Sequence, residues 1–213
     1  MPPAAATPRA GMLQGDGITC TLGLRVLFDR LSLRVPAGVT LVQGGEGTGK
    51  TSLLRLLAGE LAASSGQLRI GTVDLATHPA AYRQQVFLAD PRTQVFDQIT
   101  PLAYLASLQA RYPGFDAACI GGLIDGLSLS EHQHKPLYML STGSRRKVWF
   151  AGAVASGATV TLLDEPFAAL DSRSMAFVRQ LLTDAANNPL RAWVLADYEA
   201  PAGVPLAGVI DLG

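Results

Sequence analysis

Hydrophobic and polar positions alternate along the first part of the chain in a pattern that predicts strands. Residues 17–22 and 30–35 are expected to form two antiparallel strands on either side of a turn around Gly23. Residues 39–43 form a short apolar run that ends in glycines, which is typical of a buried strand. The pattern therefore predicts an antiparallel flank followed by a core strand.

The period then changes to that of a helix. Leucines at positions 53, 54, 56 and 57 recur at helical spacing, and Gly59 is expected to end this helix. Residues 64–70 and 85–89 return to strand-like patterns. From Thr100 to about residue 140 the pattern is helical again, with Pro101 well placed at a helix start.

The last third of the chain alternates between helices and strands. Residues 141–156 are apolar on almost every side of a helix, so we expect this helix to be mostly buried. Further elements are expected at residues 158–166 (strand), 171–188 (amphipathic helix), 191–197 (strand) and 208–212 (strand). Strands that alternate with helices predict an α/β fold with a mainly parallel core sheet and right-handed crossovers. The helical stretch at roughly residues 91–157 is expected to be an inserted subdomain.

Length and composition indicate how large the hydrophobic core is and where the folded domain begins. At 213 residues the chain can bury one core of ordinary size. Its 48% hydrophobic and 16% charged residues suit a compact domain with a wide buried surface. The Ala- and Pro-rich start predicts a disordered tail at residues 1–14, which leaves a single domain at residues 15–213.

Charge and cysteine content argue against several classes of protein. Lys and Arg total 17, Asp and Glu also total 17, and no basic run is present, so no nucleic-acid partner is expected. No run of 18 apolar residues occurs, so the chain is not expected to cross a membrane by itself. Cys20 and Cys119 are expected to be reduced thiols rather than a disulfide framework.

The glycine-rich stretch after the first core strand fits the P-loop pattern, although a plain glycine-rich turn is the alternative. Gly44-x-x-x-x-Gly49-Lys50-Thr51 lies between a predicted strand and a predicted helix, which is the context that the pattern requires. Backbone N–H groups of such a loop converge on phosphates, Lys50 is expected to reach the β- and γ-phosphates, and Thr51 to ligate Mg²⁺. The nucleotide-binding residues expected here are Gly44, Gly45, Glu46, Gly47, Thr48, Gly49, Lys50, Thr51 and Ser52.

An acidic pair ends the apolar strand at residues 158–166. Asp164 is expected to aim a carboxylate at the metal ion, and Glu165 is placed to polarise an attacking water as a general base. Asp164 follows Lys50 by 114 residues (164 − 50), and we expect it on a neighbouring strand. A solvated strand end is the alternative interpretation of such a pair, but the joint pattern with the P-loop favours a nucleotide site.

A third motif, at residues 140–144 (LSTGS), points to a family. The order of P-loop, helical stretch, LSTGS, TLLDEP and then FAALD closely resembles the nucleotide-binding domain of ABC ATPases, over roughly residues 17–198. In that family two domains pair head to tail, and the signature residues of one chain close over ATP held by the other chain. The resemblance gives this role to Ser141, Thr142, Gly143 and Ser144, and places the loop that contains Asp171 along the dimer seam.

The resemblance also implies a fold, cofactors and partners. It implies a P-loop NTPase fold, ATP and Mg²⁺ as cofactors, ATP hydrolysis, and pairing with a second ATP-binding domain as a homodimer or heterodimer. It implies a separate membrane permease, contacted by residues 90 to about 105, and a place on the cytoplasmic face of the membrane. Residues 18–28, 49–59 and 162–171 are most similar to the ATP-binding subunits of haem exporters in cytochrome c maturation.

Several positions depart from the family pattern. Thr142 and Ser144 stand where the signature has Gly and Gln. The switch position carries His in the family and aligns here with Asp197, a catalytic candidate whose ionised carboxylate would repel the γ-phosphate. The lid position carries Gln and aligns with Asp90, which is expected to ligate metal. Together with Glu46, these carboxylates are expected to weaken nucleotide binding, unless Glu46 points to solvent.

Two functions from different classes remain open from the sequence. The first is an ATP-binding subunit that drives a separate permease by dimer closure and ATP hydrolysis, which these departures are expected to slow. The second is a nucleotide-gated regulatory module, or a degenerate partner in a heterodimer, with little turnover, and Asp197 motivates it. A soluble ABC protein of translation or DNA repair fits less well, because the sequence has no tandem domains, coiled-coil insertions or zinc-binding cysteines.

Overall fold

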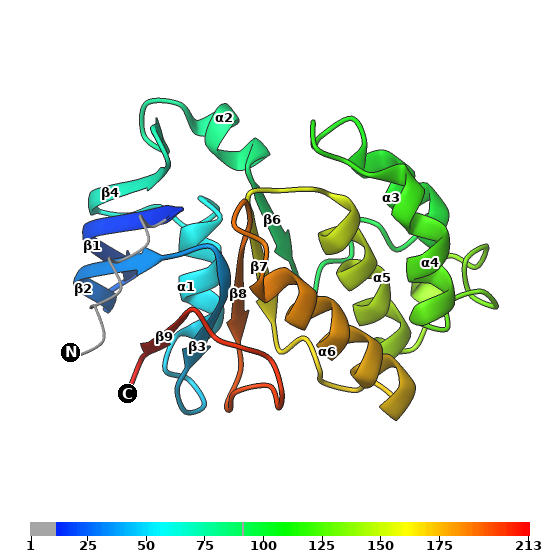
Figure 1. The fold of residues 1–213 in the computed structure, drawn as a ribbon. Helices are drawn as coiled ribbons and strands as arrows, with labels where there is room; N and C mark the ends of the chain where they lie inside the picture. The colour runs from blue at the N-terminus through cyan, green and yellow to red at the C-terminus, as the bar shows by residue number, and fades with distance from the viewer. Residues whose placement is uncertain (1–11, 91) are drawn as a thin grey trace, which may run out of the picture.

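Two β-sheets and a group of helices make up the computed structural model, which describes residues 12–90 and 92–213 (Figure 1). The first sheet is antiparallel and has the order β2-β1-β4-β5. Its strands are β1 (Leu13–Leu22), β2 (Arg25–Val35), β4 (Ser65–Ile70) and β5 (Val73–Asp74). The predicted antiparallel flank is therefore confirmed.

The ordered domain begins earlier than the sequence predicts. Leu13 and Gln14 belong to β1 and pair with residues of both β2 and β4. The Leu13 side chain is fully buried, and burial of its apolar surface stabilises this part of the strand. The Ala- and Pro-rich composition of the preceding residues gave no sign of a strand here. The predicted boundary at residue 15 is therefore wrong, and residues 1–11 of the expected tail lie outside the described residues.

The second sheet is parallel and has the order β6-β7-β8-β3-β9. Its strands are β3 (Gly38–Gln43), β6 (Val86–Ala89), β7 (Val160–Asp164), β8 (Ala192–Ala196) and β9 (Gly208–Asp211), which match the predicted strands. The sequence predicts that Asp164 lies on a strand next to β3. This prediction is wrong, because β8 lies between β3 and β7. The register nevertheless aligns the three strand ends, since Ala196 pairs with both Val42 and Asp164.

The parallel sheet is buried on both faces, and side chains along each strand alternate between two cores. Val194 and Ala196 of β8 join one core, which also contains α1 (Lys50–Leu57) and the inner residues of the antiparallel sheet. Trp193 and Leu195 join the other core, which contains the remaining long helices. Helix α1 therefore lies between the two sheets, and its first residue follows directly from the loop after β3.

The helices between β6 and β7 lie on the opposite side of the molecule from the antiparallel sheet (Figure 1). They are α3 (Pro101–Leu108), α4 (Ile120–Gly126) and α5 (Thr142–Ala155), with the 3-10 turns η1 (Ala117–Cys119) and η2 (Leu137–Met139). The subdomain boundary at residues 91–157 stays a prediction. The other helices are α2 (Pro79–Gln84) and α6 (Ser172–Ala186). None of the helices in the described ranges has the length and apolar character needed to cross a bilayer.

Candidate nucleotide-binding site

A cavity of about 380 Å³ opens where three strands of the parallel sheet end. The loop after β3, the acidic pair after β7 and a tyrosine after β8 contribute to it. Its lining residues are Glu46, Gly47, Thr48, Gly49, Lys50, Thr51, Ser52, Arg92, Asp164, Glu165 and Tyr198. Open α/β sheets bind their ligands at this carboxyl edge. The structure therefore brings the P-loop and the acidic pair to one cavity, as the sequence predicts.

The P-loop adopts a backbone conformation that favours glycine. Gly47 and Gly49 have φ values of +74° and +100°, in the region that residues with a Cβ atom rarely adopt. Gly49 is the N-cap of α1, and no side-chain capping hydrogen bond is made there by the described part of the chain. Among residues 12–90 and 92–213, the first N–H groups of α1 therefore have no side-chain partner, which suits an anion at the helix N-terminus.

Lys50 lines the cavity but is only 7% exposed. Its Nζ donates to the carbonyl oxygens of Gly44 and Gly45, at 2.6 and 2.8 Å. The same Nζ lies 4.1 Å from the centroid of the Tyr198 ring, which is a cation–π contact. An ammonium group has three N–H donors, so Lys50 is fully engaged by the protein in this structure.

Thr51 and Asp164, the two residues expected to share a metal ion, are in direct contact. Thr51 Oγ1 donates to Asp164 Oδ2 at 2.8 Å. Burial raises the pKa of the Asp164 carboxyl above its usual value, and the hydrogen bond from Thr51 opposes that rise. Hydroxyl and carboxylate oxygens are the ligands that Mg²⁺ prefers, so this pair fits the predicted metal site.

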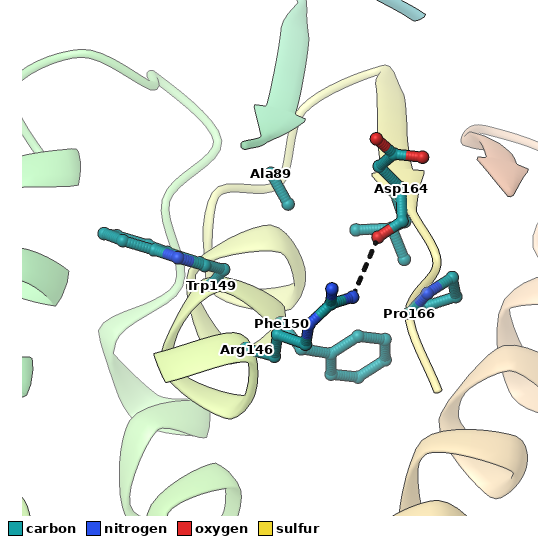
Figure 2. Close-up of a pocket in the computed structure, with 7 residues that line it drawn as sticks. Ala89, Arg146, Trp149, Phe150, Asp164 and Pro166 are labelled. Carbon is teal, nitrogen blue, oxygen red and sulfur yellow. Dashed lines mark hydrogen bonds between the residues drawn. The ribbon is translucent and has the colours of Figure 1, made fainter. Parts of the chain in front are cut away.

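Glu165 lines the same cavity with an uncommon backbone conformation. Its φ is +46°, which costs free energy for a residue with a Cβ atom and often marks functional sites. Its N–H donates to Ala196 O at 2.9 Å, and its carbonyl accepts from Arg146 Nη1 at 2.6 Å. Figure 2 shows Arg146 reaching from α5 to the backbone carbonyl of Asp164, whose carboxylate points away. Arg146 therefore holds the backbone of the acidic pair.

The signature segment lies outside this cavity. Ser141, Thr142, Gly143 and Ser144 are not among its lining residues. Ser141 is the N-cap of α5, because its Oγ accepts from the Ser144 N–H at 3.2 Å. A Cβ atom placed on Gly143 would lie 2.2 Å from the carbonyl oxygen of Ala169, so this glycine allows two segments to pack closely. The structure therefore does not bring the signature and the P-loop of one chain together.

Asp171 connects the signature helix to α6 within the same chain. It is the N-cap of α6, since its Oδ1 accepts from the Ser174 N–H at 2.9 Å. Its Oδ2 accepts from Lys147 Nζ of α5 at 2.5 Å. The bond from Lys147 and the bonds from Ser174 hold the pKa of the Asp171 carboxyl well below its usual range. Both carboxylate oxygens are therefore satisfied by neighbouring residues.

Two predicted site residues do not reach the cavity. Asp90 Oδ1 accepts from the Arg92 N–H at 2.9 Å, and Asp90 lines a separate pocket beside α3. Asp197 Oδ1 accepts from the Tyr198 N–H at 2.8 Å, and Asp197 is not among the lining residues. Each short carboxylate accepts a hydrogen bond from the backbone of its own turn. Burial raises the pKa of the Asp197 carboxyl, and the nearby charge of Glu165 adds to that rise while Lys50 opposes it. The residue that lines the cavity after β8 is Tyr198, one position later than the sequence alignment predicts.

The expected crowding of carboxylates around a triphosphate is therefore reduced. Of Glu46, Asp90 and Asp197, only Glu46 lines the cavity, and it is exposed on the P-loop. Of Arg92, Arg145 and Arg146, the compensating charges that the sequence offers, Arg92 lines the cavity and brings a positive charge to it. An exposed carboxylate is largely screened by water, so Glu46 is a smaller obstacle to phosphate binding than three buried carboxylates would be.

This fold and this cavity define a P-loop nucleotide-binding domain. The family model described as ABC transporter matches residues 28–168, so the chain belongs to the ABC transporter family. A relative from Pseudomonas syringae pv. syringae (strain B728a), the cytochrome c biogenesis ATP-binding export protein CcmA, is 33% identical over 180 residues, which cover 83% of this chain and 84% of the relative. The CcmA protein of Methylococcus capsulatus is 33% identical over 172 residues, covering 80% and 83%. The predicted resemblance and its subtype are confirmed.

Solved structures show the same fold at lower identity. An ATP-binding subunit of an ABC transporter has a TM-score of 0.79 at 18% identity, and the match covers 88% of this chain and 79% of that chain. The dimeric ATP-binding cassette MJ0796, in a post-hydrolysis state bound to ADP and Pi, has a TM-score of 0.74 at 18% identity, with 88% of both chains covered. The predicted α/β P-loop fold is therefore confirmed.

Proposed function

We propose that this chain is the ATP-binding subunit of an exporter and that two such domains pair head to tail around ATP. The observation that carries this proposal is the separation of the P-loop cavity from the signature segment in one chain. A second domain that brings its own Ser141 and Gly143 would complete the cavity. The MJ0796 cassette, which is similar in fold, is dimeric. Its dimeric state supports the pairing.

The cavity residues have distinct proposed roles in hydrolysis. Lys50 and the N-terminus of α1 attract the β- and γ-phosphates. Thr51 and Asp164 would hold Mg²⁺, which when bound neutralises phosphate charge. Glu165 Oε2 lies 3.8 Å from Arg146 Nη2. Because the Glu165 side chain is 38% exposed, its carboxylate is accessible to a water molecule that it can polarise.

Mixing two inactive variants tests the head-to-tail pairing. Lys50→Ala removes a phosphate contact, and Ser141→Ala removes a signature contact, so each alone should lower ATP turnover by about 100-fold. In a mixed dimer, one of the two sites combines an intact Lys50 with an intact Ser141. An equal mixture should therefore regain about a quarter of the wild-type rate. The measurement is phosphate release from Mg-ATP, with Glu165→Gln as the blank, and no recovery would contradict the pairing.

Export also requires a separate membrane partner, and we propose that it contacts the segment before α3 at the cytoplasmic face of the membrane. Val95 in this segment is 83% exposed. A pocket of about 130 Å³ beside it is lined by Thr93, Phe96 and Tyr104, among others. An exposed apolar side chain next to a pocket suits the insertion of a short partner helix. The relatives are named as export proteins of cytochrome c biogenesis, which supports that setting.

Charge substitution at this surface tests the membrane contact. Val95→Asp should lower the fraction of the chain that sediments with native membranes, because a carboxylate opposes burial in an apolar contact. Turnover of ATP by the isolated chain should persist. Leu190→Asp is the matched control, since Leu190 is 74% exposed between α6 and β8, and it should sediment like the wild type. Equal losses in both variants would remove the support for a contact at Val95.

The regulatory alternative is not favoured. It depended on a carboxylate at position 197 facing the γ-phosphate, and this carboxylate instead accepts a hydrogen bond from the Tyr198 N–H. Two relatives that are each 33% identical to this chain are named as ATP-binding export proteins. Because Asp197 does not line the cavity, we assign it no role in hydrolysis.

A further inference from the structure

Lys50 and Tyr198 make a contact that the proposed hydrolysis does not explain. The Lys50 Nζ lies 4.1 Å from the centroid of the Tyr198 ring, and both residues line the nucleotide cavity. The other two donors of Lys50 are directed to the carbonyl oxygens of Gly44 and Gly45. For Lys50 to donate to a phosphate, at least one of these three contacts has to be given up.

The ring of Tyr198 is the contact that is easiest to give up. The two carbonyl groups belong to the P-loop backbone, whereas Tyr198 is a side chain that is 56% exposed. Its hydroxyl makes no hydrogen bond to any residue of the described ranges, and only its backbone N–H is fixed, by Asp197 Oδ1. The ring can therefore turn toward solvent without breaking a hydrogen bond of its own.

We propose that Tyr198 is a positioning residue that competes with the nucleotide phosphates for the Lys50 ammonium. The negative face of the ring contacts the third N–H of Lys50, the donor that would otherwise be available to a phosphate. ATP has to displace the ring, and Lys50 then turns to the phosphates. This inference rests on ATP binding at the P-loop cavity, and it adds an opposing contact that lowers the affinity of the site.

Removing the ring tests the competition directly. Tyr198→Leu keeps an apolar side chain but no π face, so Mg-ATP should bind about two- to fivefold more tightly, as expected for the loss of a partly exposed cation–π contact. Tyr198→Phe keeps the ring face and should bind ATP like the parent protein. Titrations are made in the Glu165→Gln background, so that ATP is not consumed.

The chain offers a matched control for this substitution. Tyr138 has the same exposed fraction as Tyr198, 56%, and it does not line the cavity. Tyr138→Leu should therefore leave the affinity for Mg-ATP unchanged. Unchanged or weaker binding by Tyr198→Leu would overturn the proposal, and so would Tyr198→Phe if it behaved like Tyr198→Leu.

A purely structural role for Tyr198 would not depend on Lys50, so a double-mutant cycle separates the two roles. In a Lys50→Met background, Tyr198→Leu should no longer tighten ATP binding, and a tightening that persists would overturn the proposal. The proton signals of the Lys50 ε-methylene group should be shifted upfield by the ring. That shift should disappear in Tyr198→Leu and on addition of Mg-ATP. A parent protein that binds no ATP would count against the proposed function itself, along with this inference.

Discussion

The P-loop and the signature segment both lie at a helix N-terminus, but they satisfy that terminus in different ways. The P-loop uses backbone alone, because Gly47 and Gly49 have positive φ and no side chain caps α1. In the signature segment, the Ser141 hydroxyl caps α5 by accepting from the Ser144 N–H. The N–H groups of α1 are thus left for a ligand, whereas those of α5 are partly engaged by the chain itself.

The P-loop and the signature segment also differ in their surroundings. The P-loop faces a cavity whose acidic residues come from the same chain. The signature segment is supported from behind, by the close approach of Gly143 to Ala169 and by the ion pair of Lys147 with Asp171. These contacts fix its shape without completing a cavity. We therefore interpret the P-loop as the binding half of the site and the signature as a preformed surface for a second domain.

The largest expected effect belongs to the binding half. Glu165→Gln keeps the shape of the side chain and removes its basicity, so ATP turnover should fall by about 10²- to 10⁴-fold while ATP binding is retained. Phosphate release and nucleotide titration measure the two properties separately. Glu199→Gln is the control, because Glu199 is exposed and does not line the cavity. Turnover that survives in Glu165→Gln would exclude this residue as the general base.

The next effect tests whether Thr51 and Asp164 act as one unit. Thr51→Val removes the hydroxyl that donates to Asp164 Oδ2 and leaves a half-buried carboxylate without this partner. The gain in ATP affinity that Mg²⁺ provides should shrink by about tenfold, which corresponds to the loss of one hydrogen bond to a charged group. Thr51→Ser keeps the hydroxyl and should preserve most of the gain. An equal effect of Mg²⁺ in Thr51→Val and wild type would contradict a metal site here.

A smaller effect is expected where the signature segment is held from behind. Gly143→Ala places a Cβ atom against the Ala169 carbonyl, so the free energy of unfolding should fall by about 1–3 kcal/mol, as for other overpacked sites. Gly45→Ala is the matched substitution in the P-loop, because its Cβ would lie 3.8 Å from the Thr48 side chain. Urea unfolding of both variants measures the difference. Equal stability would mean that the support of the signature is not as rigid as the structure indicates.

The two halves were not equally predictable from the sequence. Local patterns sufficed for the P-loop, because a strand, glycines at fixed spacing and a helix follow one another along the chain. The strand order was not predictable, since the pairing of β8 with both β3 and β7 joins residues far apart in sequence. The two-residue strand β5 and the short helix α2 are too brief to show a period.

Side-chain direction at strand ends was the other limit. Successive residues of a strand point to opposite sides, so an alignment error of one position assigns the wrong residue to a site. Asp197 and Tyr198 are adjacent in the turn after β8, so a shift of one position is enough to select Asp197 and to miss Tyr198, the residue that lines the cavity. An aromatic residue two positions after the end of a core strand was the signal that the sequence offered for Tyr198.

The smallest effect concerns the charge that joins the signature helix to α6. Asp171→Asn keeps a cap acceptor for α6 but loses the ion pair with Lys147. Because the Asp171 side chain is 52% exposed, this loss should lower the free energy of unfolding by at most about 1 kcal/mol at pH 7.

This effect should also depend on pH with a definite sign. The pKa of Asp171 is lowered in the folded state, mainly by the bond from Lys147, so the pair stabilises the protein above the unfolded-state pKa of about 3.9. That stabilisation is lost as pH falls below this value toward the folded-state pKa. Urea unfolding at pH 7, 5 and 3.5 should show the difference between wild type and Asp171→Asn shrinking only at the lowest pH. Asp184→Asn, on the same helix, has no ion pair in the described ranges and should show no such trend. A constant difference from pH 7 to 3.5 would mean that capping of α6, and not the charge on Asp171, connects the two segments.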